Sequence, residues 1–118
     1  MRAAREAGVK IALGSDVHLG TALELRRMIH HGLTPAQALV AATRTAAEAL
    51  DLGGCISTVE EGKLADLLIV DGDPLTEPGL LGDGNRIWLV LQLGVPVAGR
   101  ALEQDASAVT EQRDSGGR

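Results

Sequence analysis

The feature that most constrains the fold is a short apolar run, residues 9–13, that leads directly into Gly14-Ser15-Asp16 near the start of the chain. Residues 2–7 have the pattern of the end of a helix, and Gly8 follows where helices commonly stop. A helix, a buried strand and a polar loop in this order are typical of a parallel sheet whose strands alternate with helices. The sequence therefore predicts one parallel-type strand with Asp16 at its carboxyl end.

Two helix start signals follow this strand. Thr21 and Glu24 predict a capping box, in which each side chain bonds a backbone amide of the first turn, and Gly32 predicts the end of that helix. Thr34 and Gln37 predict a second capping box, with proline at the first helical position between them. We therefore expect two consecutive helices after the loop that carries Asp16.

The second helical stretch has an apolar stripe that predicts its buried face. The stripe consists of Ala36, Leu39, Val40, Thr43, Ala47 and Leu50. Thr45 and Glu48 repeat the capping signal inside the stretch, so one long helix and two short helices joined by a kink both remain open.

The pattern changes to strands after Gly53-Gly54. We expect strands at 55–59 and 65–70, a loop at 75–85, and a hairpin of 86–93 with 95–98 that turns at Gly94. Pro96 makes the last of these an edge strand, because proline has no amide to donate. The sequence thus predicts a small antiparallel group after the helices.

Three parts of the chain follow from these patterns. Residues 1–53 form the helical α/β part, residues 54–102 form the small β part, and residues 103–118 are polar, lack periodicity and are expected to be disordered. Trp88 is the single aromatic residue among 118, so the core must be built from Leu, Val, Ile and Ala. We expect a marginal fold, and burial of further surface against a second copy, giving a homo-oligomer, stays open.

Charge and cysteine content exclude several classes of function. The net charge is −5 with no basic block, which argues against nucleic-acid binding. No apolar run approaches the ~20 residues that span a bilayer, so we expect no membrane insertion. Cys55 is the only cysteine, which rules out an internal disulfide and agrees with a reducing compartment. We expect a cytoplasmic protein.

An ordered series of motifs resembles the C-terminal third of the amidohydrolase superfamily, and within it the imidazolonepropionase-like and Xaa-Pro dipeptidase-like enzymes. The motifs lie at residues 9–16, 24–25, 31–35, 38–39, 42–43, 46–47 and 61–75. A glutamate, Glu61, stands where these enzymes often have a proline before Gly-Lys. The resemblance implies the last βα unit of a TIM-like barrel plus helices, followed by part of a β-sandwich whose N-terminal segment is not in this sequence.

The resemblance gives Asp16 a chemical role. In that family the aspartate after the eighth strand binds a divalent metal, most often zinc, and acts as general base toward the metal-bound water. The other family ligands, a His-x-His pair, a carbamylated lysine or glutamate, and two further histidines, match no position here. A barrel needs about 250 residues, and only 15 residues precede Asp16. The chain therefore carries one metal ligand without the rest of the site.

The remaining polar residues have ordinary structural interpretations. His18 lies two residues after Asp16 and could ligate a metal, but a loop position beside the substrate pocket is favoured. His30 and His31 close a helix, where an imidazole interacts favourably with the helix dipole. The sequence around Ser15 lacks the Gly-x-Ser-x-Gly nucleophile elbow, which disfavours a serine hydrolase. Three aspartates are expected at strand ends and turns: Asp66, Asp71 and Asp73.

Three functional hypotheses follow. The first is the C-terminal portion of a metal-dependent amidohydrolase that acts on amide, cyclic amide or peptide C–N bonds and is inactive until the rest of the barrel completes it and its substrate site. The second is a stand-alone, non-catalytic and dimeric binding or structural module without a cofactor. The third is a metal site that several copies rebuild from Asp16 and His18 around a shared axis.

Overall fold

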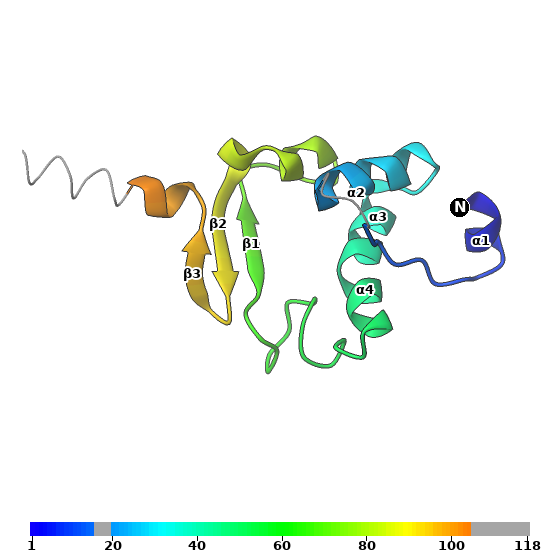
Figure 1. The fold of residues 1–118 in the computed structure, drawn as a ribbon, viewed down its shortest axis with the longest axis horizontal. Helices are drawn as coiled ribbons and strands as arrows, with labels where there is room; N and C mark the ends of the chain where they lie inside the picture. Colours follow the sequence, from blue (N-terminus) through cyan, green and yellow to red (C-terminus); the bar gives the residue numbers. More distant parts are fainter. Residues whose placement is uncertain (16–19, 105–118) are drawn as a thin grey trace, which may run out of the picture.

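A computed structural model describes residues 1–15 and 20–104. The helices and the strands form two neighbouring groups, and a pair of 3-10 turns connects them along one side (Figure 1). The elements are α1 (Arg2–Glu6), α2 (Thr21–His30), α3 (Pro35–Ala42), α4 (Arg44–Ala49), β1 (Leu67–Val70), η1 (Pro78–Gly82), η2 (Gly84–Arg86), β2 (Ile87–Gln92) and β3 (Val95–Ala98). The chain is thus α/β, with the helical part first and the small sheet second, in the order that the sequence predicts.

The three strands form one antiparallel sheet in the order β1-β2-β3. Leu93 and Gly94 form the tight turn between β2 and β3, both with positive φ (53° and 79°), and the Leu93 amide donates a 2.7 Å hydrogen bond to Asp66 Oδ1. Pro96 lies on β3, an edge strand, where a missing amide is tolerated. The predicted hairpin about Gly94 and the edge position of Pro96 are both confirmed.

The predicted strand at 9–13 is wrong, because none of the strands in the described part of the chain pairs with these residues. The segment still has the side-chain alternation of a strand. Ile11 and Leu13 are half-buried against the helical core, whereas Lys10 and Ala12 are exposed. Its backbone is linked to α3 by a 2.9 Å hydrogen bond from the Leu13 amide to the Ala41 carbonyl. A ladder needs a neighbouring strand, so apolar pattern alone does not create one.

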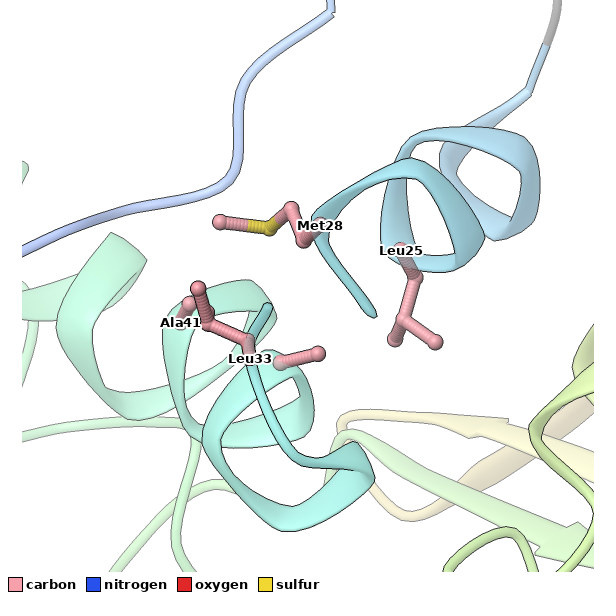
Figure 2. Packing of buried hydrophobic residues seen from close by; sticks show 5 residues of the cluster. Leu25, Met28, Leu33 and Ala41 are labelled. Atoms are coloured by element: carbon pink, nitrogen blue, oxygen red, sulfur yellow. The ribbon is translucent and has the colours of Figure 1, made fainter. Parts of the chain in front are cut away.

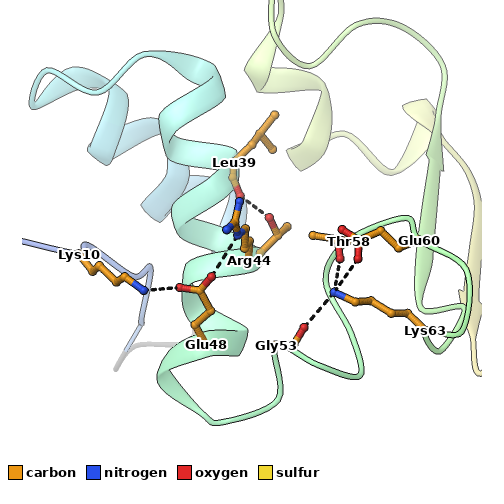
Figure 3. Close-up of polar contacts among 9 residues, drawn as sticks. Lys10, Leu39, Arg44, Glu48, Gly53, Thr58, Glu60 and Lys63 are labelled. Atoms are coloured by element: carbon orange, nitrogen blue, oxygen red, sulfur yellow. Dashed lines mark hydrogen bonds and ion pairs between the residues drawn. The ribbon is translucent and has the colours of Figure 1, made fainter.

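The predicted strand at 55–59 is also wrong, because the chain folds back on itself there. Lys63 Nζ donates to the Gly53 carbonyl at 2.9 Å and to Thr58 Oγ1, and it lies 3.4 Å from a Glu60 carboxylate oxygen (Figure 3). These contacts hold 53–60 as a loop around the lysine ammonium, with the Val59 side chain exposed. Three polar partners of one cation outweigh the β-propensity of this short run.

The two predicted capping boxes have different outcomes. At α3 the box is present: the Gln37 amide donates to Thr34 Oγ1 at 3.2 Å, and the Thr34 amide donates to Gln37 Oε1 at 3.0 Å. At α2 the box is wrong, because Gly20 occupies the N-cap and Thr21 is already inside the helix. Glu24 instead pairs with Arg27 at 2.7 Å. Glycine takes the N-cap here with a φ of 84°, a conformation that threonine avoids.

This difference gives a direct test. Thr34→Ala removes the side-chain acceptor at the start of α3 and is expected to lower the free energy of unfolding by about 1 kcal/mol. Thr21→Ala removes no capping bond and is expected to change it by less than about 0.5 kcal/mol. Urea unfolding followed by far-UV circular dichroism compares the two. Equal losses in both variants would contradict the assignment of the caps.

The second helical stretch is two helices, because it breaks at Thr43 (φ −118°, ψ −90°), whose hydroxyl donates to the Leu39 carbonyl at 2.7 Å. The kink is therefore confirmed, whereas the capping signal at Thr45 is wrong, since α4 has no side-chain cap.

The predicted buried stripe is also partly wrong. Val40 and Leu50 are exposed. The buried positions are Ala38, Ala41 and Ala47. Small side chains let α3 approach α2 closely, so alanine rather than the larger residues faces the interior.

The core lies between α2 and α3 and is formed by aliphatic side chains (Figure 2). Its buried members are Leu25, Met28, Leu33, Ala38 and Ala41. Half-buried side chains pack against it from the N-terminal segment, the helices and η1: Ile11, Leu13, Ile29, Leu39, Ala42 and Leu81. In the part of the chain that the structure describes, the buried core thus contains no aromatic residue, as predicted, but it consists of Leu, Ala and Met28, and valine and isoleucine are not among its fully buried members.

The end of the described chain is helical at 100–104, so the first two residues of the predicted disordered tail continue a helix. The rest of that prediction, 105–118, lies outside the described residues. Across 1–15 and 20–104, none of the helices has the length and apolar character needed to cross a bilayer.

Candidate functional site

The two candidate metal ligands, Asp16 and His18, fall at positions 16–19, outside the described residues. The structure describes both ends of the loop that carries them. On one side, 9–15 runs along the helices and is held through Leu13; on the other, Gly20 is the N-cap of α2. Ser15, next to Asp16, is exposed. The described residues on either side of this loop are the end of the extended N-terminal segment and the start of α2 (Figure 1).

An ion-pair network fixes the N-terminal segment to α4. Lys10 Nζ lies 2.8 Å from Glu48 Oε2, and Arg44 Nε lies 3.0 Å from Glu48 Oε1 (Figure 3). Arg5 adds a second attachment, because its guanidinium donates to the Gly32 carbonyl at 2.9 Å. The hydrogen bond from Lys10, followed by that from Arg44, lowers the pKa of Glu48. These contacts hold the segment that leads to Asp16 in one place on the helices.

The lowered pKa of Glu48 predicts the sign of a pH effect. Because the folded state prefers the ionised carboxylate, Glu48 contributes to stability. This contribution is fully present above the ordinary glutamate pKa of about 4.3, and it is lost as pH falls below that value through the lowered pKa of the folded state. Glu48→Gln is therefore expected to destabilise the protein at pH 7 and to make its melting temperature less sensitive to acid between pH 6 and pH 3. The effect is small and falls with salt, since the Glu48 side chain is partly exposed to solvent and its partners Lys10 and Arg44 are exposed.

Glu61→Gln, the same change at an exposed carboxylate, is the matched control for this experiment. Thermal melts of the wild-type protein and both variants across the pH range provide the comparison. An acid dependence of Glu48→Gln identical to that of the wild-type protein would show that the network contributes nothing.

The donors in the described residues do not by themselves fit a metal ion. No group of three His, Cys, Asp or Glu side chains converges within 1–15 and 20–104. His30 and His31 lie at the end of α2 with ring centroids 5.4 Å apart and ring planes at 76°. Asp16 and His18 add two donors of the types that zinc accepts, but a protein zinc site takes three or four. Further ligands would have to come from beyond the residues that the structure describes.

The three aspartates of the β part have structural partners, as predicted. Asp66 Oδ1 accepts the Leu93 amide at the hairpin, and Asp73 Oδ1 accepts the Leu75 amide at 2.8 Å, which closes a turn. Asp71 Oδ2 lies 3.7 Å from the Arg100 guanidinium. Their positions explain them as turn and strand-end residues.

Sequence reasoning did not anticipate two apolar hollows. One, of about 530 Å³, opens between the helices and the sheet and is lined by Leu25, Leu39, Leu68 and Val70. Thr21, five residues after Asp16 in the sequence, also lines it. The other, of about 310 Å³, is a groove beside α3. The apolar run of β1, in which Leu68 is exposed, was the available signal, because an exposed apolar strand marks a surface with nothing packed on it.

The fold and the motif at its start define the class of protein. The sequence profile of the amidohydrolase family matches residues 1–103, and the chain belongs to this family. Members of the family are generally metal-dependent. The imidazolonepropionase of Pseudomonas putida (strain GB-1) is 45% identical over 75 residues, which are 58% of this chain and 19% of the relative.

Solved structures agree with the sequence match. A Xaa-Pro dipeptidase with bound methionine in its active site superposes on 83% of this chain and 24% of its own, with a TM-score of 0.75 and 32% identity. The crystal structure named as that of a putative prolidase from Bifidobacterium longum superposes on 81% of this chain and 25% of its own, with a TM-score of 0.74 and 35% identity. The chain thus spans about a fifth to a quarter of the length of these relatives.

Proposed function

We propose that this chain is the C-terminal portion of a metal-dependent hydrolase that cleaves amide, cyclic amide or peptide C–N bonds. The observation that supports this most is the family match over residues 1–103, which includes the segment that ends in Gly14-Ser15-Asp16. The names of the relatives, an imidazolonepropionase and a Xaa-Pro dipeptidase, favour a cyclic amide or a small peptide as substrate.

Asp16 is the residue to which we assign the proton transfer. A carboxylate at the carboxyl end of a barrel strand can accept the proton of an attacking water and then deliver it to the nitrogen of the leaving group. The divalent metal, which we expect to be zinc, supplies Lewis acidity when it is bound. His18 stands two residues away and is a further candidate ligand. The chain contributes at most these two donors, so activity requires the rest of the barrel.

A stand-alone module without catalysis is the second candidate. The exposed apolar side chains of the sheet favour it, because a dimer would bury them; examples are Leu68, Ile69, Val95 and Val97. Assembly of several copies around Asp16 and His18 is the third. A cytoplasmic location remains a prediction from the sequence, with which the single cysteine agrees.

The test of the proposal is an assay of the purified chain alone, with and without zinc, on a panel of Xaa-Pro dipeptides and cyclic amides. We expect no turnover above the metal-only background, and no stoichiometric zinc by elemental analysis, because two donors do not hold a catalytic metal. Zinc-dependent turnover of the isolated chain that is lost in Asp16→Asn would contradict the proposal that activity requires the rest of the barrel. A concentration-dependent dimer with bound zinc would favour the assembly of copies.

A further inference from the structure

We propose that Lys63 is the latch of a strained strap, residues 53–60 of the connection between α4 and β1, and that this strap opens locally without unfolding of the rest of the chain. In the closed state the Lys63 ammonium holds the strap, and in the open state its contacts are broken. The proposal goes beyond the proposed function and does not depend on it, because the contacts that close the strap lie within residues 52–64.

The strap has few of the contacts that usually fix a segment. None of the residues 53–60 is buried, and Val59 is 86% exposed. Within 53–60, all of which the structure describes, the amides of Cys55 and Ile56 alone donate to another backbone group, and both donate to the Leu52 carbonyl. Neither apolar burial nor a β-ladder therefore holds the strap in place.

Lys63 supplies the contacts that are otherwise missing (Figure 3). Its Nζ donates to the Gly53 carbonyl at 2.9 Å and to Thr58 Oγ1, and it lies 3.4 Å from a Glu60 carboxylate oxygen. The Lys63 side chain is 15% exposed. Hydrogen bonds of a charged group stabilise more than neutral ones, and partial shielding from water strengthens them. One ammonium therefore joins the first residue of the strap to its last.

Ser57 places backbone strain inside the closed strap. In the part of the chain that the structure describes, three non-glycine residues have a positive φ, and two of them have ordinary explanations: Asp51 follows the end of α4, and Leu93 lies in the hairpin turn. Ser57, with a φ of 73°, belongs to neither kind of position. Serine adopts this conformation at a cost and keeps it only where surrounding contacts enforce it. The neighbouring residue, Thr58, is held by Lys63, so the latch acts directly beside the strain.

The closed strap is a wall that two hollows share. Ile56, Ser57 and Val59 line the apolar hollow of about 530 Å³ between the helices and the sheet. Gly53 lines a polar hollow of about 500 Å³ beside α4, and Thr58 lines both. A strained segment that one cation holds between two hollows has the properties of a switch region. Opening of the strap removes the wall between the hollows.

Amide hydrogen exchange of the unsubstituted chain is the first test. The Leu64 amide donates to the Cys55 carbonyl of the strap at 2.9 Å, so it exchanges when the strap opens. The Ala38 amide, in a fully buried residue of α3, is the reference for unfolding of the core. We expect the Leu64 amide to exchange at least about tenfold faster than the Ala38 amide, relative to their unprotected rates. Low concentrations of denaturant are expected to accelerate exchange of Ala38 but not of Leu64, because local opening exposes little surface.

The second test removes the latch. Lys63→Met keeps the length of the side chain, removes its charge and donors, and is expected to accelerate exchange of the Leu64 amide by about tenfold or more. Lys10→Met is the matched control, because Lys10 pairs with Glu48 outside the strap. Its effect on the exchange of Leu64 by local opening is expected to stay within about twofold, since opening of the strap does not break that pair.

Two variants at Ser57 test the strain and do not require Lys63→Met to fold. Ser57→Asn is expected to slow exchange of the Leu64 amide by about twofold or more, because asparagine adopts a positive φ more readily than other residues with a side chain. Ser57→Val is expected to accelerate it by about fivefold or more, because a β-branched residue disfavours this conformation. In the double variant with Lys63→Met, Ser57→Asn is expected to restore part of the lost protection.

Three results would overturn the proposal. The first is a Leu64 amide that exchanges with the same rate and denaturant dependence as Ala38, and the second is an equal effect of Lys63→Met and Lys10→Met. The third is exchange of Leu64 that neither variant at Ser57 changes. None of these measurements involves hydrolysis, so the latch and the proposed function can fail separately.

Discussion

Replacing Gly99 by alanine is expected to destabilise the three-stranded sheet by more than about 2 kcal/mol. Gly99 follows β3 with a φ of +115°, and an added Cβ would lie 2.5 Å from the Trp88 carbonyl oxygen and 2.7 Å from the Leu89 Cα. Both contacts are with the backbone of β2, which cannot move without breaking its pairing with β1 and β3. The substitution combines a steric overlap with a backbone conformation that alanine avoids.

Trp88 is a convenient probe of this effect. It is the only Phe, Tyr or Trp in the sequence, it lies on β2 with 38% of its surface exposed, and the Arg100 guanidinium lies 5.8 Å from its ring centroid. Urea unfolding followed by tryptophan emission should give an earlier transition for Gly99→Ala. Gly54→Ala is the control, since a Cβ there meets nothing within 4 Å. An unchanged midpoint in Gly99→Ala would contradict the close approach of Gly99 to β2.

Replacing Leu25 by alanine is expected to lower the free energy of unfolding by about 2–5 kcal/mol. In a protein with so small a core, this is enough to unfold much of the helical part. Leu25 is 3% exposed and packs between α2 and α3 (Figure 2). Leu25 also borders the hollow between the helices and the sheet. Few neighbouring side chains can therefore move in to fill the cavity that the substitution leaves. Cavity and lost apolar burial therefore act in the same direction.

Leu50→Ala is the matched control for Leu25→Ala, because Leu50 is 71% exposed and its change is expected to stay within about 0.5 kcal/mol. Far-UV circular dichroism during thermal unfolding measures both variants. Similar melting temperatures for the two would mean that the core lies elsewhere than between α2 and α3.

Local signals predicted several elements of the fold well. The proline and glutamine after Thr34 define the start of α3, and Gly94 defines the hairpin, because each acts through contacts within a few residues. The capping box at Thr21 failed for an equally local reason, since Gly20 was already able to take the N-cap conformation. These outcomes depend on neighbouring residues that the sequence shows.

Elements that depend on distant partners were predicted less well. Residues 9–13 have the apolar pattern of a strand, but a strand also requires a neighbour to pair with. Residues 55–59 have β-propensity, but Lys63 draws the chain into a loop. In α3 the buried face consists of alanines, because the distance between helices decides which side chains fit. Tertiary contacts, which pattern does not contain, decided all three.

The candidate site followed from the motif around Asp16, and its role remains a prediction, since Asp16 and His18 lie outside the described residues. The structure describes the segment before this loop, which is held by the hydrogen bond from the Leu13 amide to the Ala41 carbonyl and by the ion pairs of Glu48. The Arg44–Glu48 pair has the i,i+4 spacing of a helix, but the contacts of Lys10 and Leu13 could not be inferred from spacing, because their partners lie up to 38 residues away in the chain.

The most direct test of the central claim is zinc-dependent hydrolysis by the assembly of this chain with the complementary part of a relative, measured for Asp16→Asn and for Asp73→Asn. The second variant makes the same chemical change at a turn aspartate whose bond to the Leu75 amide an asparagine can keep. We predict that Asp16→Asn lowers turnover by at least about 100-fold while Asp73→Asn leaves it within about twofold. Full turnover in Asp16→Asn, or an assembly without any turnover, would contradict the claim that this chain supplies a catalytic aspartate to a metal-dependent hydrolase.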